Sequence, residues 1–244
     1  MKKAKIKFIF GFGFFMLKYL VQLIYPNLCI CCQNHLVASE QFVCTTCLLE
    51  LPETNFHLVS NNPVEKTFWG RVKIERGMSL LFYKKGGKTA KLLFALKYHD
   101  NPEIATFLGR YYGTKIKNFC KENNIAAVAA IPLHKAKLRM RGYNQSAMLA
   151  KGLSETLQIA DLSPWLVRNK FTETQTKKSR IERSDNVSNV FEVADEKAFE
   201  GKHILLIDDV ITTGATIESC ANELLQIKGL QISVAGLAFA HHGV

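Results

Sequence analysis

The sequence lacks several features by which large classes of proteins are recognised. It contains no internal repeat and no low-complexity tract, so neither a solenoid nor a disordered linker protein is indicated. Gly11-Phe12-Gly13 lacks the third glycine of a dinucleotide-binding fingerprint, and Gly201-Lys202 precedes its strand, which excludes a Walker loop. With 244 residues and 48% hydrophobic content, the chain can form one sizeable α/β domain and a small appendage.

Acidic residues are scarce relative to basic ones. There are 21 Asp and Glu residues against 32 Lys and Arg, which gives a formal net charge of +11. Such a balance favours anionic partners, namely phosphorylated substrates, nucleic acid or a membrane surface, and charge alone does not choose among them.

Cysteine is rare outside one short segment. Five of the seven cysteines lie between residues 29 and 47, while Cys120 and Cys220 occupy helical patterns and are expected in the core. This distribution argues against a secreted disulfide framework and favours a metal site in a reducing compartment. Two C-x-x-C pairs predict a structural zinc ribbon, with Cys31 as a spare thiol and His35 as a substitute ligand or a loop residue. The predicted zinc ligands are Cys29, Cys32, Cys44 and Cys47.

The N-terminal segment contains an apolar run that is too weak to be a clear membrane span. Lysines precede the run from Phe8 to Leu17, as in a signal peptide or an anchor, but no small-residue cleavage site follows. A central Lys18 costs roughly 2.5 to 3.5 kcal/mol in a bilayer. We predict an amphipathic helix that lies on a membrane, on a partner or on the protein's own body, so that residues 1–25 are a candidate for peripheral membrane contact. The expected location is cytoplasmic with such an association.

The most informative stretch joins a buried strand to a helix. Ile204–Ile207 is an apolar run typical of a parallel strand, and Asp208 and Asp209 follow it directly. A Thr- and Gly-rich turn leads into a helical pattern that begins near Ile217. Loop amides at a helix N-terminus bind phosphate, and Gly214 removes a Cβ that would block its approach. The segment therefore predicts a phosphate site beside two carboxylates.

This segment resembles the phosphoribosyl-diphosphate (PRPP) signature of type I phosphoribosyltransferases. The resemblance implies that Asp208 and Asp209 hold the ribose hydroxyls. It also implies a loop that cradles the 5′-phosphate, formed by Thr212, Thr213, Gly214, Ala215 and Thr216.

Two further basic stretches follow the expected order of a ligand-binding α/β sheet. The first is a predicted loop over residues 133–142 that leaves the strand Ile125–Ile131, where ligands of such sheets bind. The second, residues 168–183, has the composition of a mobile active-site lid. The predicted pyrophosphate contacts are Lys135, Lys137, Arg139 and Arg141, with Arg180 or Arg183 closing over them.

Together these segments resemble the ComF family of competence-associated, phosphoribosyltransferase-like proteins. The resemblance rests on the C-x-x-C pairs, Leu96–Tyr98, Ile131–His134, Arg141–Gln145 and Gly201–Thr216. It implies a parallel sheet flanked by helices, a smaller hood and an N-terminal zinc element. We predict a leader helix over residues 1–27, a zinc ribbon over 28–57, a linker over 51–70 and a phosphoribosyltransferase-like domain over 70–241.

The resemblance also implies a role in the uptake of transforming DNA. Three functions remain open: a Mg²⁺-dependent phosphoribosyltransferase with an unidentified acceptor, a non-catalytic module that binds a nucleotide or single-stranded DNA for the competence machinery, and a purine or pyrimidine salvage enzyme. Salvage is the weakest because it needs no zinc ribbon. In the basic loops only Tyr143 and Phe171 are aromatic, which gives little support for base stacking. Asp208, Asp209, Arg141 and Arg183 are the predicted catalytic residues.

Overall fold

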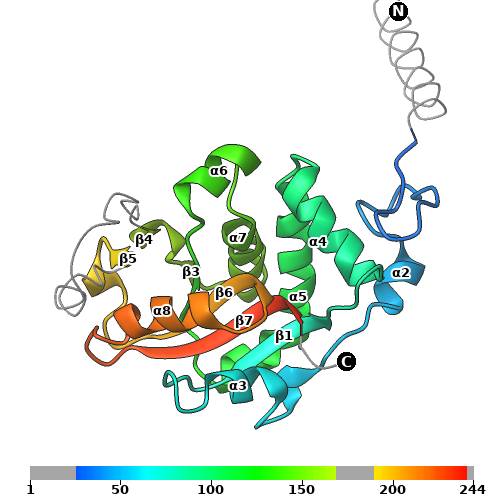
Figure 1. The fold of residues 1–244 in the computed structure, drawn as a ribbon. Coiled ribbons are helices and arrows are strands. Elements are labelled where there is room, and N and C mark those ends of the chain that lie inside the picture. The colour runs from blue at the N-terminus through cyan, green and yellow to red at the C-terminus, as the bar shows by residue number, and fades with distance from the viewer. Residues whose placement is uncertain (1–25, 169–189, 241–244) are drawn as a thin grey trace, which may run out of the picture. The chain divides into compact units, whose positions relative to one another are not determined.

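A computed structural model describes residues 26–168 and 190–240 (Figure 1). The chain divides into two compact units, Met1–Leu51 and Pro52–Val244. The predicted leader helix lies outside the described residues, except for its last two positions, and so does most of the basic stretch 168–183. Among the described residues, no helix combines the length and the apolar character that crossing a bilayer requires.

The first unit is organised around its cysteines. Leu28 and His35 form an antiparallel bridge, and the short helix α2 (Thr45–Leu49) begins after Cys44, which caps it. Val43, Cys29, Cys31 and Cys47 are buried, so that the thiols themselves form much of this small interior. A unit of this size has few other apolar residues to bury, which is the usual situation of small metal-stabilised domains.

The larger unit is built on a five-stranded parallel sheet in the order β1-β7-β6-β2-β3. The strands are β1 (Gly77–Phe82), β2 (Ala127–Ala130), β3 (Ala160–Asp161), β6 (His203–Ile211) and β7 (Gln231–Phe239). Ile204–Ile207 at the centre of β6 is fully buried. The parallel sheet expected from the apolar runs is confirmed.

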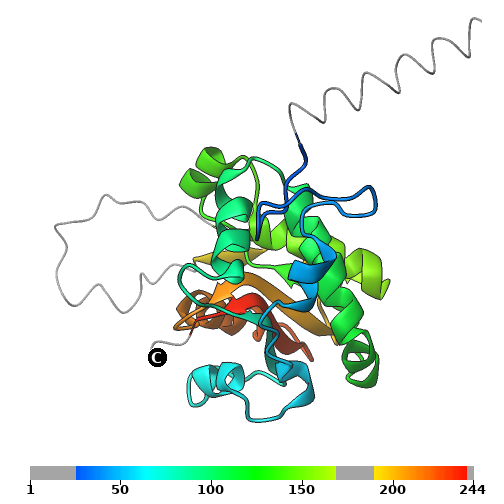
Figure 2. The ribbon, with the colours of Figure 1, turned by 90° about the vertical axis from the view of Figure 1, so that its right-hand side faces the viewer.

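Helices cover both faces of this sheet (Figures 1 and 2). The helices α4 (Lys88–Tyr98), α5 (Glu103–Glu122) and α7 (Gln145–Leu157) lie on one face, and α8 (Ala215–Leu224) lies on the other. This division follows from right-handed crossovers, because β2 leads to β3 in one direction along the sheet and β6 leads to β7 in the opposite direction.

The closest helix contact in this layer joins α5 and α7. A Cβ added to Gly109 would lie 2.2 Å from the carbonyl oxygen of Leu149, and one added to Gly152 would lie 2.1 Å from that of Thr106. Only glycine at both positions permits this backbone approach, which fixes the first turn of α7 above β2 and β6.

The segment predicted to be a linker is folded. It contains the 3₁₀ turn η1 (Phe56–Leu58) and the helix α3 (Pro63–Phe68), and it buries Phe56, Val64 and Phe68. Asn62 caps α3 and donates from Nδ2 to the carbonyl of Gly77 at 2.8 Å. The linker prediction was wrong because asparagine followed by proline, taken there as a loop signal, is also a helix start.

Two short strands form a separate antiparallel pair. They are β4 (Leu166–Arg168) and β5 (Phe191–Val193), and Phe191 is buried. The 3₁₀ turns η2 (Ser163–Trp165) and η3 (Glu196–Ala198) flank this pair. The predicted lid residues between the two strands, Arg180 and Arg183 among them, lie outside the described residues.

Candidate functional site

The two adjacent carboxylates lie inside β6, near its carboxyl end. The strand continues to Ile211, so it does not stop at the acidic pair as the sequence suggested. Asp208 Oδ1 accepts hydrogen bonds from the Ser146 hydroxyl at 3.2 Å and from the backbone N–H of Asp209 at 2.9 Å. Asp209 Oδ2 lies 3.6 Å from Lys97 Nζ. Helices α7 and α4 thus each place one polar group against the pair.

The surroundings of Asp208 favour its neutral form. Burial raises the pKa of this carboxyl to about 7, and the negative charge of Asp209 acts in the same direction. The hydrogen bonds from Asp209 N–H and Ser146, together with the charge of Lys97, oppose this shift only in part. Adjacent carboxylates with one raised pKa are suited to bind neighbouring hydroxyl groups, since such a pair can both donate and accept.

A tight turn follows the strand and begins α8. Gly214 has φ of +72°, a left-handed conformation, and it forms the N-cap of the helix without a side-chain hydrogen bond to the first turn. The four neighbouring loop residues, Thr212, Thr213, Ala215 and Thr216, are exposed. Helix-start amides without a side-chain cap, combined with exposed hydroxyls, are the elements of an anion site.

Packing against α3 is a further reason for glycine at position 214. A Cβ there would meet the ring of Phe68 on α3, at 2.7 Å from Cε1 and 2.9 Å from Cζ. The turn is therefore packed against α3, and glycine satisfies both this contact and the positive φ.

Arg71 supports the same turn and was missed by the sequence reasoning. Its guanidinium donates to the carbonyl of Thr213 at 2.5 Å, to that of Thr67 at 3.0 Å and to the carboxylate of Glu218 in α8. A planar, always charged fork is suited to join three acceptors in this way. Local sequence gives no signal for this role, because Glu218 is 147 residues away.

The Arg-Gly-Tyr-Asn-Gln segment joins four elements around the acidic pair. The hydroxyl of Tyr143 donates to the carbonyl of Leu96 in α4 at 2.5 Å. Asn144 caps α7 through Ser146 N–H and donates to the carbonyl of Ile131, beyond β2, at 3.0 Å. Ser146 in turn reaches Asp208. The segment therefore fixes α4, β2 and α7 relative to β6.

Two donors of this segment are buried without an acceptor within the described residues. They are Nε of Arg141 and Nε2 of Gln145, although Arg141 Nη1 does donate to Gln145 Oε1 at 3.0 Å. Buried donors without an acceptor are expected where a ligand supplies the acceptors.

The basic segment after β2 is a helix and not the expected loop. Helix α6 (Lys135–Arg141) begins after His134, whose Nδ1 accepts from Ala136 N–H at 3.3 Å. Lys135, Lys137 and Arg139 are exposed and form no ion pair within the described residues, so they are available to an anionic ligand. The groups in contact with the acidic pair are instead Ser146 and Lys97.

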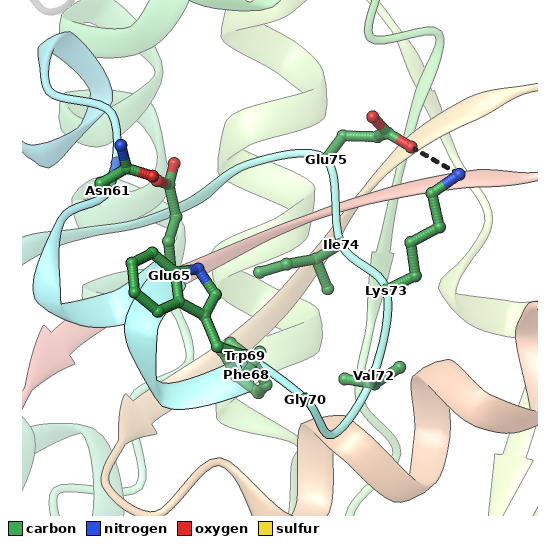
Figure 3. Close-up of a pocket in the computed structure, with 9 residues that line it drawn as sticks. All are labelled: Asn61, Glu65, Phe68, Trp69, Gly70, Val72, Lys73, Ile74 and Glu75. Carbon is green, nitrogen blue, oxygen red and sulfur yellow. Dashed lines mark hydrogen bonds and ion pairs between the residues drawn. The ribbon is translucent and has the colours of Figure 1, made fainter.

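A pocket lies beside α3, and one of its lining residues, Phe68, also packs against Gly214 (Figure 3). Its charged side chains are paired, since Lys73 Nζ lies 3.8 Å from Glu75 Oε1, and Arg76 Nε donates to Glu65 Oε1 at 2.7 Å. It is lined by Asn61, Glu65, Phe68, Trp69, Gly70, Val72, Lys73, Ile74 and Glu75. No predicted site residue lines it.

The four predicted zinc ligands form one cluster in the first unit. The Sγ atoms of Cys29, Cys32, Cys44 and Cys47 all lie within 4.8 Å of one another, and this cluster could hold a metal ion. The Sγ atoms of Cys32 and Cys44 are 3.8 Å apart, which matches the edge of about 3.8 Å expected for a tetrahedron with Zn–S bonds of about 2.3 Å.

Backbone donors prepare one of these thiols for a metal. Burial opposes ionisation of Cys29, but hydrogen bonds from the backbone of Cys44, Cys32 and Cys31 outweigh it and lower its pKa to about 6. Burial raises the pKa of Cys47. A cation bound among the four sulfurs would supply the charge that ionises the remaining thiols.

Comparison with known proteins agrees with this arrangement. Residues 144–244 match the phosphoribosyl transferase domain. Over 115 residues the chain is 37% identical to Competence protein F of Haemophilus influenzae, a match that covers 47% of the chain and 50% of that protein. Over 225 residues it is 27% identical to DNA utilization protein YhgH of Escherichia coli, a match that covers 86% of the chain and 95% of that protein. These similarities support a phosphoribosyltransferase-like protein of the ComF type.

The domain match begins inside the Arg141–Gln145 segment and includes the acidic pair and the turn. Among solved structures, the chain is similar to the glutamine PRPP amidotransferase from B. subtilis complexed with ADP and GMP, with 18% identity and a TM-score of 0.41. That similarity covers 59% of the chain and 30% of the amidotransferase.

Proposed function

We propose that this protein binds PRPP or a closely related phosphorylated ribose at the carboxyl end of β6 and acts as a phosphoribosyltransferase. In this proposal Asp208 and Asp209 bind the ribose hydroxyls, and the turn Thr212–Thr216 binds the 5′-phosphate. One observation carries the proposal: two adjacent carboxylates directly precede a glycine turn and a helix N-terminus that has no side-chain cap.

The proposed reaction requires stabilisation of charge more than a covalent nucleophile. The bond between ribose C1′ and the pyrophosphate oxygen breaks, and pyrophosphate leaves with the electron pair. A lone pair of the acceptor forms the new bond to C1′, and the acceptor then releases its proton. Cations near the leaving group lower this barrier by electrostatic stabilisation. Arg141 is one candidate, because its Nε is buried without an acceptor within the described residues.

Mg²⁺ fits the donor set of the proposed site. Asp208 and Asp209 supply the carboxylate oxygens that this ion prefers in proteins. When bound with PRPP, the ion would neutralise charge on the leaving pyrophosphate. Lys135, Lys137 and Arg139 on α6 are proposed to add positive charge, and Arg183 is proposed to close over the site.

The proposed role of the protein lies in DNA uptake and depends on its relatives. Proteins named for competence and for DNA utilization are similar to this chain, and we propose the same context and a partner in that machinery. We further propose that the cysteine cluster holds zinc with a structural role, because four thiolates leave no open position for catalysis.

A second candidate function is a module that binds a nucleotide or single-stranded DNA without turnover. The exposed cations of α6, which form no ion pair within the described residues, favour it. They would contact the phosphates of a long ligand as readily as pyrophosphate.

The decisive experiment measures PRPP binding by calorimetry with Mg²⁺ and pyrophosphate release with a panel of nucleobases. We expect wild-type protein to bind PRPP, and Asp209→Asn and Arg141→Ala each to weaken binding by about tenfold or more, since each removes a charge-assisted contact worth roughly 1.5–3 kcal/mol. Glu122→Gln, an exposed change on the last residue of α5, is the matched control and should bind like wild type.

The outcomes separate the two candidates. Pyrophosphate release that is lost in Asp209→Asn supports the transferase. PRPP binding without release by any acceptor favours the module. Wild-type protein that does not bind PRPP at all would contradict the proposed site, and unchanged affinity in Arg141→Ala would contradict the role of that residue.

A further inference from the structure

Helix α4 exposes two neighbouring aromatic rings to solvent. Phe94 is 58% exposed and Tyr98 is 61% exposed, which is unusual for side chains of this size. Their ring centroids are 4.7 Å apart and the ring planes are inclined by 41°, while the ring of His99 lies edge-on to Phe94 at 6.1 Å. The rings thus form one continuous aromatic surface, and they do not fill a gap in the protein.

The same helix turns its aliphatic side chains inward. Leu92, Leu93 and Leu96 are 0%, 5% and 1% exposed. The rings of Phe94 and Tyr98 are therefore the only large apolar groups that α4 presents outward. This arrangement differs from a helix that binds a bilayer, because such a helix exposes a wide aliphatic and aromatic face.

Lysines predominate in the segment that contains the two rings. Residues 84–99 include five lysines and no acidic residue. Lys91 shares a helix face with Phe94 and Tyr98 because the three are spaced at i, i+3 and i+7, and it is exposed, as are Lys84 and Lys85 in the preceding turn. A ligand of this surface therefore has negative charge and flat apolar groups.

The end of α4 also borders the acidic pair. Lys97, next to Tyr98 in the sequence, lies 3.6 Å from Asp209, and the carbonyl of Leu96 accepts the hydroxyl of Tyr143. Helix α6, which has the exposed cations Lys135, Lys137 and Arg139, stands above the sheet together with α4 (Figure 1). A long anionic ligand on α4 would thus lie near the mouth of the proposed site.

We propose that this face of α4 binds single-stranded nucleic acid, with unpaired bases stacked on Phe94 and Tyr98 and phosphates at the surrounding lysines. Alternating aromatic rings and cations recognise a single strand because every base has a flat face and every nucleotide has a phosphate. A duplex does not offer its base faces. This inference rests on the second candidate function, whose ligand it specifies, and it is independent of turnover.

The sequence alone gave little support for base stacking, because only the aromatic residues of the basic loops were considered. Tyr143 donates its hydroxyl to Leu96, and it is partly buried. Phe171 lies outside the described residues. The exposed rings belong instead to helix α4.

The test uses a fluorescent oligothymidylate and full-length protein. We expect Phe94→Ala/Tyr98→Ala to weaken binding of the single strand by about tenfold or more, as stacking contributes roughly 1–3 kcal/mol per base. The salt dependence of the residual binding should stay unchanged, because no charge is lost. Lys91→Gln should instead reduce the slope of log affinity against log salt by about 0.7.

Matched control variants exclude a general loss of folding as the cause of weaker binding. Trp69→Ala removes a ring that is 59% exposed elsewhere in the same unit, and Tyr98→Phe retains the ring; both should bind like wild type. PRPP affinity should be unchanged in the double variant.

Three results would overturn the inference. The first is equal binding of the single strand by the wild type and the double variant, and the second is a preference for duplex of the same sequence. The third is a double variant that loses binding to phosphatidylglycerol vesicles and still binds the single strand like wild type. If the wild-type protein binds the strand through α6 only, the second candidate function is supported and the proposed binding surface on α4 is contradicted. If the wild type binds no strand, both fail, while the PRPP proposal is unaffected.

Discussion

Asp208 and Asp209 have different surroundings although they are neighbours in the chain. Asp208 accepts from neutral donors and has a pKa raised to about 7, whereas Asp209 faces the ammonium of Lys97. A folded-state pKa above the unfolded value means that the folded protein retains a proton that the unfolded chain has already lost. The free energy of unfolding should therefore fall as pH rises from about 4 to about 7, and this contribution is fully absent above that range.

We predict that Asp208→Asn stabilises the protein more at pH 8 than at pH 4.5. At the lower pH the Asp208 carboxyl is largely neutral in the folded protein, so that the amide replaces one neutral group with another. At the higher pH the wild type must hold a charge in partly buried surroundings, which the variant avoids. Chemical denaturation at both pH values measures the difference. An equal effect at both would show that the pKa of Asp208 is near its ordinary value.

Single residues differ in how well the sequence could predict them. The acidic pair and the glycine turn could be predicted because the strand, the carboxylates and the helix start lie within a few consecutive residues. Ser146, Lys97 and Arg71 could not, since they approach from segments distant in the chain; Ser146 is 62 residues from Asp208. The four cysteines of the predicted metal site could be chosen for the same local reason, and their sulfurs do converge.

At the scale of elements, α3 and the following residues act as a support for the turn before α8. Phe68 limits the space above Gly214, and Arg71 holds the carbonyl of Thr213. A support of this kind keeps loop amides in a fixed geometry before any ligand arrives, which reduces the entropy lost on binding.

We predict that Gly214→Ala weakens PRPP binding and lowers thermal stability more than Gly70→Ala does. Both glycines have a similar positive φ, +72° and +70°, so the backbone cost of roughly 1–2 kcal/mol is shared. Only at 214 does the added Cβ meet a ring, since nothing lies within 4 Å of a Cβ at 70. Melting temperature and PRPP affinity of the two variants measure the difference. Equal losses would mean that the contact with Phe68 contributes nothing.

Two elements departed from the sequence expectations for a common reason. The predicted linker contains α3, and the predicted basic loop contains α6. Helix α6 buries no residue, and α3 is only six residues long, so neither has the extended apolar periodicity from which helices are recognised. Asn62, the cap of α3, was the available signal, whereas His134, the cap of α6, is not among the preferred N-cap residues.

At the scale of the whole molecule, the two units depend on different interactions. The larger unit has a continuous apolar core, whereas the interior of the smaller one is formed largely by thiols. Metal removal should therefore affect the two units unequally.

We predict that Cys47→Ala lowers bound zinc to well below one ion per chain, while Cys31→Ala leaves the ratio unchanged. Cys47 belongs to the four converging sulfurs, and Cys31, although buried, does not. Elemental analysis of purified variants gives the ratio, and circular dichroism should show that the strands and helices of the larger unit persist in Cys47→Ala. Loss of zinc from Cys31→Ala would require a different ligand set.

In the last turn of α4, the side chain of Lys97 lies beside Asp209, and the ring of the next residue, Tyr98, is exposed to solvent. Lys97 and Tyr98 are consecutive, and the carbonyl of Leu96 is held by Tyr143. Any ligand that shifts this turn changes the distance between Lys97 and Asp209. Thermodynamic linkage then makes the effect reciprocal. If a bound strand changes the affinity for PRPP by some factor, bound PRPP changes the affinity for the strand by the same factor. A small sugar phosphate inside the protein would thus regulate how tightly a polymer is held outside it.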